Sequence, residues 1–83
     1  MQLDLLPTDV LLHRVDPSEN MRRYYRLHIA PDLFGGCALV REWGRIGQSC
    51  RREVELHDTP GRALDRLVVV ARQKKGRGYV VIA

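Results

Sequence analysis

The sequence predicts an α+β fold in which a single antiparallel sheet carries one helix on one face. Three observations indicate this fold: alternating strand-like segments fill most of residues 10–57, turn signals separate them, and one capped amphipathic segment follows at residues 60–75. The 83 residues are predicted to form one domain, 1–83. Its core must be modest, because a chain of this length buries only about 60–65% of the surface that its unfolded form exposes.

The first two strands are expected at residues 10–15 and 21–29. The first is an apolar segment that ends at a turn signal, Asp16-Pro17-Ser18. The second alternates in polarity, which is typical of a strand with one buried face. Its two faces hold Arg23, Tyr25, Leu27 and Ile29 on one side and Arg22, Tyr24, Arg26 and His28 on the other.

Residues 37–46 and 50–57 are expected to pair as a hairpin. The connector between them, Gly47-Gln48-Ser49, is short and begins with a glycine that tolerates positive φ. This hairpin would keep Cys37 far from Cys50, so a disulfide between them is not expected. Two reduced thiols favour a cytoplasmic protein.

The predicted helix at residues 60–75 has clear start and stop signals. Asp58 or Thr59 is expected to cap it, Pro60 suits its first position, and Gly76 or Gly78 ends it. A short strand is expected at residues 79–82. The apolar stripe that we expect to face the sheet consists of Leu64, Leu67, Val68 and Ala71.

The charge distribution favours a nucleic-acid partner. The net charge is +4, and after Asp65 the chain holds five basic residues and no acid. Twelve of the fourteen basic residues are arginine, which suits phosphate recognition but also follows from a GC-rich coding sequence. The basic residues expected at the end of the helix to attract DNA are Lys74, Lys75 and Arg77.

Membrane insertion and secretion are not expected. No apolar run approaches the roughly 20 residues that a membrane-spanning helix needs. Residues 1–6 contain Asp4 and lack the basic segment that begins a secretory signal.

The sequence favours a binding module over an enzyme. His13, His28 and His57 fall in three different predicted strands without metal-ligand spacing, so we expect no metal site. Gly44 and Gly47 lie in a hairpin and not between a strand and a helix, which argues against a dinucleotide-binding loop. We therefore expect no cofactor, no catalytic residue and no small-molecule substrate.

The segment from Arg41 to Arg45 is the candidate site. Residues two apart share a face of a strand, so Arg41, Trp43 and Arg45 are expected to project together. An indole flanked by guanidinium groups suits a stacked nucleotide and its phosphates. Gly44 has no side chain, which lets another molecule approach the backbone. The alternative is that Trp43 has a structural role and not a binding role, because the sole Trp of a small domain is often a core residue.

Trp43-Gly44-Arg45, followed by Ile46-Gly47 and Gln48, resembles the signature of the WGR domain, a module of DNA-dependent poly(ADP-ribose) polymerases and of many bacterial proteins. The likeness extends to the Tyr-rich strand before the motif, to the charged strand and helix after it, and to the closing Gly78-Tyr79. It implies an antiparallel sheet with one helix. In the polymerase members the motif Trp packs against the terminal nucleotide of a DNA end, and the motif Arg contacts DNA and neighbouring domains.

Two departures from the polymerase members limit what the resemblance implies. These 83 residues contain neither a zinc finger nor a transferase domain, so catalysis is not carried over. Residues 69–75 lack an aromatic and Asn-rich pattern and look more like the bacterial branch. The resulting hypothesis is a module for DNA ends, nicks or single strands, and its rival is a protein-interaction domain that docks a partner enzyme through the same hairpin or a sheet edge.

Overall fold

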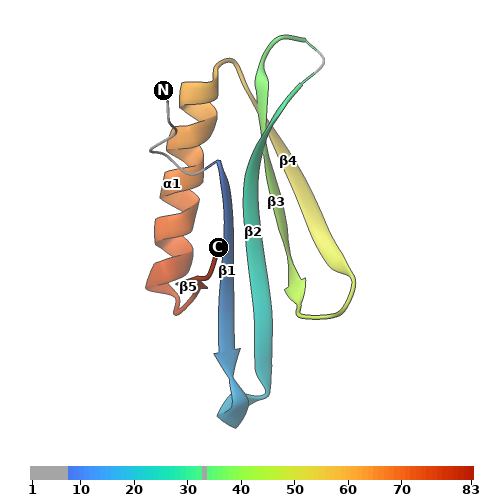
Figure 1. Cartoon of the computed structure of the whole chain (residues 1–83), viewed down its shortest axis with the longest axis vertical. Coiled ribbons are helices and arrows are strands. Elements are labelled where there is room, and N and C mark those ends of the chain that lie inside the picture. The colour runs from blue at the N-terminus through green and yellow to red at the C-terminus, as the bar shows by residue number, and fades with distance from the viewer. Residues whose placement is uncertain (1–7, 33) are drawn as a thin grey trace.

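The computed structural model describes residues 8–32 and 34–83 of the chain. In that part of the chain the strands form one sheet in the order β4-β3-β2-β1-β5, and each neighbouring pair is antiparallel (Figure 1). The predicted α+β architecture is confirmed. The elements are β1 (Asp9–Asp16), the 3₁₀ turn η1 (Pro17–Glu19), β2 (Met21–Pro31), β3 (Cys37–Arg45), β4 (Cys50–His57), α1 (Pro60–Gly76) and β5 (Val80–Val81).

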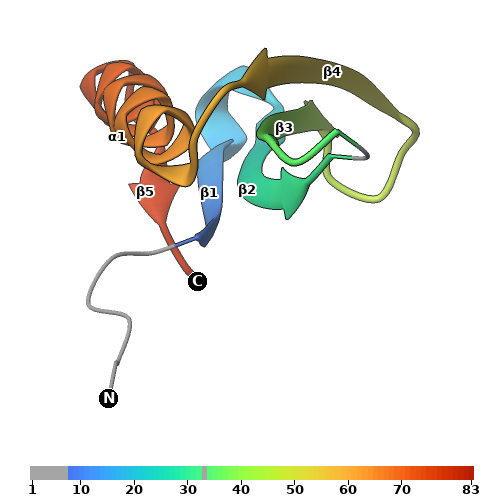
Figure 2. The same ribbon diagram turned by 90° about the horizontal axis from the view of Figure 1, so that it is seen from above.

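The helix α1 lies on one side of the strongly twisted sheet, as Figure 2 shows from above. The core lies between α1 and the sheet, because the apolar residues of β1, β2 and β3 alternate toward the helix. Tyr25 belongs to this core although it carries a hydroxyl group, and it is only 2% exposed. The buried cluster consists of Val10, Leu12, Tyr25, Leu27, Leu39, Leu67 and Val70.

The face that α1 turns to the sheet is rotated from the predicted one. Leu67 lies at its centre as expected and is 1% exposed, but Ala63 and Val70 are the other buried helix residues. The prediction missed Ala63 because a small side chain gives a weak apolar signal. It missed Val70 because three successive valines fit more than one helical phase. The other predicted residues, Leu64, Val68 and Ala71, are only partly buried.

Local signals fixed the element boundaries well. Thr59 caps α1, accepting a hydrogen bond at its hydroxyl from the backbone N–H of Arg62. Gly47 adopts a φ of +84° in the β3–β4 turn, as a hairpin glycine should. Strand register places Cys37 opposite His57 and Cys50 opposite Gly44. The two thiols therefore lie at opposite ends of the hairpin and are free.

The prediction about secretion rests on residues 1–6, which lie outside the described residues. Across residues 8–32 and 34–83, no helix combines the length and the hydropathy that crossing a membrane requires. In the same ranges, no three His, Cys, Asp or Glu side chains are grouped so as to hold a metal ion.

Candidate nucleic-acid interface

Trp43 lies partly in the core and partly at the surface. It occupies β3 directly opposite Tyr25 of β2, and the two rings stack with centroids 5.5 Å apart and planes inclined by 11°. Because Tyr25 is buried, this contact ties one part of the indole to the core. The rest of the indole remains accessible. Trp43 therefore packs on the core, as the structural interpretation expects, and is also partly exposed, as a binding role requires.

A cavity of about 330 Å³ opens beside Trp43. Tyr79 contributes a second aromatic side chain, and its ring meets Tyr25 edge-on at 6.2 Å. The two aromatic and two guanidinium groups provide stacking surfaces and anion donors around one hollow. The residues that line it are Arg23, Trp43, Gly44, Arg45 and Tyr79.

Arg23 and Tyr79 were not singled out from the sequence as site residues. Arg23 reaches the cavity because it pairs directly with Arg45 across β2 and β3, whereas Tyr79 comes from the segment after α1. The alternation of β2 does put Arg23 on the face of Tyr25. A register between β2 and β3 would have been needed to place it beside the motif.

Arg45 is held at the rim of this cavity by the turn that follows η1. Its guanidinium donates hydrogen bonds to the carbonyl oxygen of Asn20 at 3.0 Å and to the side-chain Oδ1 of Asn20 at 3.1 Å. Asn20 adopts a left-handed φ of 53°, a conformation that Asn tolerates better than most residues. A guanidinium has five N–H donors, so donors remain for an external anion.

Arg41 shares the strand face of Trp43 as expected, but protein groups hold its guanidinium. Nε donates to the hydroxyl of Tyr25 at 2.7 Å, and Nη1 donates to Glu55 at 2.8 Å. Burial alone would lower the pKa of Arg41, but these hydrogen bonds raise it. Arg41 does not line the cavity and instead anchors the ring on which Trp43 stacks.

Gly44 points away from Trp43, toward the β3–β4 turn. A Cβ atom built there would lie 3.1 Å from the carbonyl oxygen of Ser49 and 3.3 Å from the Cα of Cys50. A side chain at this position would therefore require the backbone at Ser49 and Cys50 to give by a few tenths of an ångström. The Gly44 backbone still lines the cavity. Gly44 therefore has a structural reason to be glycine, besides the approach of a ligand that the sequence suggested.

The basic residues at the end of α1 do not form one patch. The Lys74 amine lies 4.5 Å from the ring centroid of Tyr25, and burial, together with Arg77 and Arg41, lowers its pKa. Lys74 is therefore part of the aromatic cluster, whereas Arg77 is exposed beyond the helix. Lys75 lies apart from both, on a groove beside β5.

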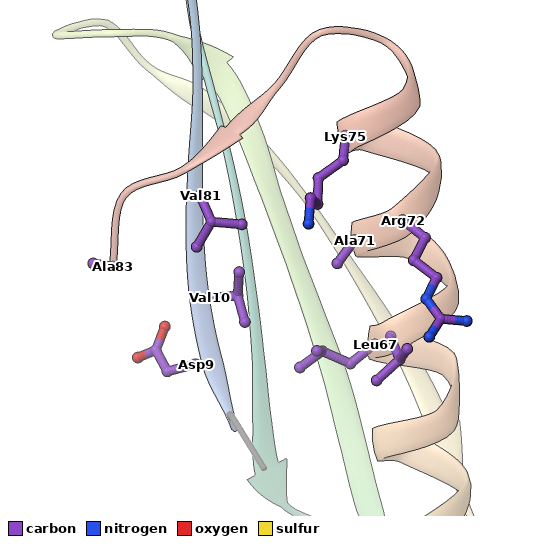
Figure 3. A pocket seen from close by; sticks show the side chains of 9 residues that line it. Asp9, Val10, Leu67, Ala71, Arg72, Lys75, Val81 and Ala83 are labelled. Atoms are coloured by element: carbon purple, nitrogen blue, oxygen red, sulfur yellow. The ribbon is translucent and has the colours of Figure 1, made fainter. Parts of the chain in front are cut away.

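That groove, of about 300 Å³, runs between α1 and the β1–β5 edge of the sheet (Figure 3). Figure 3 shows Leu67 and Val10 facing each other across it, with Arg72 and Lys75 on the helix side and Asp9 on the sheet side. Its lining is mainly apolar and holds no aromatic ring. Its chemistry does not suit stacked bases, unlike that of the cavity beside Trp43.

The comparison with known families agrees with this architecture. The family model described as "WGR domain" matches residues 8–83, which is nearly the whole chain. The chain belongs to the WGR family. WGR domains are small binding modules that generally bind nucleic acids, and the cavity beside Trp43 is built on the Trp-Gly-Arg segment from which the family takes its name.

A bacterial protein is similar to this chain over most of the chain's length. The Sinorhizobium fredii protein described as "Uncharacterized protein y4dW" is 41% identical over 73 residues, which cover 88% of this chain and 36% of the relative. The chain thus spans about a third of the length of that protein. No solved structure gave a significant match.

Proposed function

We propose that this WGR domain binds DNA at ends, nicks or single-stranded segments through the cavity beside Trp43. The observation that carries the proposal is the lining of that cavity, where Trp43 and Tyr79 lie with Arg23 and Arg45. An unpaired or terminal base can stack on an aromatic ring, while a base inside a duplex is already stacked on its neighbours. Binding of this kind needs no catalytic group and no cofactor.

In this proposal Trp43 supplies the stacking surface and Arg45 a phosphate contact. The stack on Tyr25 and the hydrogen bonds to Asn20 hold the two groups in place before the ligand arrives, which reduces the entropy cost of binding. Lys75 and Arg77 are exposed and add non-specific attraction to the backbone. The free thiols of Cys37 and Cys50 fit a reducing cytoplasm.

Substitution of Trp43 tests the proposal. Stacking contributes about 1–3 kcal/mol per base, so Trp43→Ala should weaken DNA binding roughly ten- to a hundredfold, while Trp43→Phe should retain most of the affinity. Anisotropy of labelled blunt-ended, nicked, single-stranded and circular DNA measures this without using the indole as a probe. Phe34→Ala is the matched control, because Phe34 is an aromatic residue that is 92% exposed in the β2–β3 loop.

Circular dichroism of each variant separates loss of binding from loss of folding. The proposal fails if the wild-type domain binds no DNA form at about 50 mM salt, where electrostatic attraction is strong. It also fails if circular duplex binds as tightly as DNA with ends.

The second candidate is a protein-docking domain, and the position of β4 favours it. β4 is the edge strand beyond β3, and most of its residues are exposed. An exposed edge can accept an additional strand from a partner, although the charged residues along it oppose indiscriminate pairing. Absence of DNA binding at low salt, together with capture of a partner that Val54→Pro abolishes, would favour this candidate.

A further inference from the structure

A row of three arginines crosses the sheet beside the Trp43 cavity. Arg14 of β1 lies directly opposite Arg23 of β2, and Arg23 lies directly opposite Arg45 of β3. All three lie on the helix side of the sheet, because each is two residues along its strand from the row Leu12, Tyr25 and Trp43. Figure 1 shows that β1 and β2 run on past the C-terminal end of α1. Arg23 is exposed, whereas Arg14 and Arg45 are half-buried, and the Arg14 side chain lies against Gly78 after the helix.

Such a row carries an energetic cost within the protein. Like charges at directly opposite positions of antiparallel strands are destabilising, and this row has two such pairs in succession. Among the described residues, the acids that form ion pairs with arginine do so elsewhere: Asp9 and Glu42 with Arg26, Glu53 with Arg41, and Glu55 with Arg41 and Arg66. None of the described ion pairs includes a member of the row. Of the row, Arg45 donates hydrogen bonds to the uncharged oxygens of Asn20, and no described carboxylate offsets the repulsion, so an external anion would relieve it.

We propose that the row Arg45, Arg23 and Arg14 is the track for the sugar-phosphate backbone that leads away from the base stacked on Trp43. This inference rests on the proposed function and adds a direction: the nucleic-acid strand crosses β3, β2 and β1 in turn, perpendicular to them. Adjacent strands lie about 4.8 Å apart, so the row spans roughly 10 Å and its side chains serve two or three successive phosphates. The planar guanidinium fork suits phosphate oxygens.

The partner is a nucleic acid and not an acidic protein because of what adjoins the row. Arg23 and Arg45 line the same cavity as Trp43 and Tyr79, so bound anions would continue directly into a site for a flat aromatic group. A nucleotide strand combines regular anions with bases. A polyanion without bases, such as oligoglutamate, provides the anions alone.

Single substitutions along the row test the track, with Arg22→Ala as the matched control. Arg22 is the neighbour of Arg23 in β2, carries the same charge and is exposed on the opposite face of the sheet. Each phosphate contact contributes about 0.7–0.9 to the slope of log affinity against log salt, which is about five- to eightfold in affinity at roughly 0.1 M salt. We expect losses of this size for Arg14→Ala and Arg23→Ala and little loss for Arg22→Ala, and the double variant should lose two contacts from the slope.

Thermal unfolding distinguishes a binding row from a structural one. Removing Arg23 relieves repulsion on both sides, so Arg23→Ala should unfold at the wild-type temperature or above it. Titrations use single-stranded DNA and DNA with single-stranded ends, with oligoglutamate of equal charge as the competing anion. The track is confirmed if affinity falls while stability does not, and if oligoglutamate fails to displace the DNA at equal charge concentration.

Three outcomes would overturn the track. Arg14→Ala and Arg23→Ala could bind like Arg22→Ala while Trp43→Ala still loses affinity, which would leave the proposed function intact. Both row variants could lose their fold, which would make the row structural. Oligoglutamate could compete as well as DNA does. A wild-type domain that binds no DNA would instead remove the proposed function itself.

Discussion

Arg41 provides a sharp test of how the site is organised, because sequence and structure give it different roles. The sequence suggested a phosphate contact, whereas in the structure Arg41 donates to the Tyr25 hydroxyl and to Glu55. Arg41→Ala should therefore destabilise the fold and leave the number of phosphate contacts unchanged. Arg45→Ala should instead remove one phosphate contact and leave the stability of the fold nearly unchanged. Among the described residues, Arg45 donates side-chain hydrogen bonds only to Asn20, in an exposed turn.

The size of the effect follows from the burial of the ion pair. The side chains of Arg41 and Glu55 are 18% and 23% exposed, which lies between a surface pair and a buried one. Exposed pairs contribute about 0–1 kcal/mol, and hydrogen bonds to charged groups contribute about 1.5–3 kcal/mol. The buried Tyr25 hydroxyl also loses its partner. We expect Arg41→Ala to cost about 2–3 kcal/mol, which lowers the unfolding temperature of a domain of this size by about 10–20 °C.

Thermal denaturation by circular dichroism measures this shift, and DNA titration at two salt concentrations measures the contacts. Arg52→Ala is the control, because it removes the same charge from an exposed residue. Arg52 lies on the face of β4 opposite to that of Glu55. Combining Arg41→Met with Glu55→Gln should recover part of the lost stability, because the half-buried Glu55 charge is removed together with its Arg41 partner, while Arg66, which also loses its carboxylate, is 38% exposed and can be solvated. An Arg41→Ala domain of wild-type stability, with one phosphate contact fewer, would refute the assignment.

Two further predictions concern the core and the pH dependence of stability. Leu67→Ala should cost about 2–5 kcal/mol in a chemical denaturation experiment, because Leu67 is 1% exposed at the centre of the helix–sheet contact; a cost below 1 kcal/mol would contradict the observed helix face. Burial would raise the pKa of Glu55, but hydrogen bonds from Arg41 and Arg66 lower it below its ordinary 4.5. A carboxyl whose pKa falls on folding contributes stability above its unfolded pKa and loses it as the pH falls through its folded pKa. The free energy of unfolding of the wild type should therefore exceed that of Glu55→Gln at pH 7, and the two values should converge below about pH 4.5. A difference that stays constant across this pH range would contradict the ion-pair role.

The parts of the fold that local signals determine were predictable from the sequence. The strand β4, the start of α1 at Pro60 and the positive φ of Gly47 were all expected from neighbouring residues. Proline at the first helical position and glycine in a tight turn act through the backbone of their own segment. Distant parts of the chain have little influence on such features.

The parts of the site that depend on register were not predictable in this way. Whether Arg41 meets a phosphate or a carboxylate depends on Glu55, which lies fourteen residues away on another strand. The pairing of Arg23 with Arg45 likewise requires the register of β2 against β3. Alternation within one strand assigns a residue to a face, but it does not say which residue of the next strand lies beside it.

The three residues of the Trp-Gly-Arg segment act as one structural unit. Trp43 and Arg45 lie on the helix side of β3, where Tyr25 and Asn20 fix the indole and the guanidinium respectively. Gly44 lies between them on the other side, and its lack of a side chain lets the β4 end of the hairpin pack closely. A larger residue at that position would place its Cβ 3.1 Å from the carbonyl oxygen of Ser49, so the end of the hairpin would have to shift by a few tenths of an ångström. The geometry of the candidate binding surface therefore depends on a residue that faces away from it, so substitutions at Gly44 should alter binding through the hairpin and not through a lost contact.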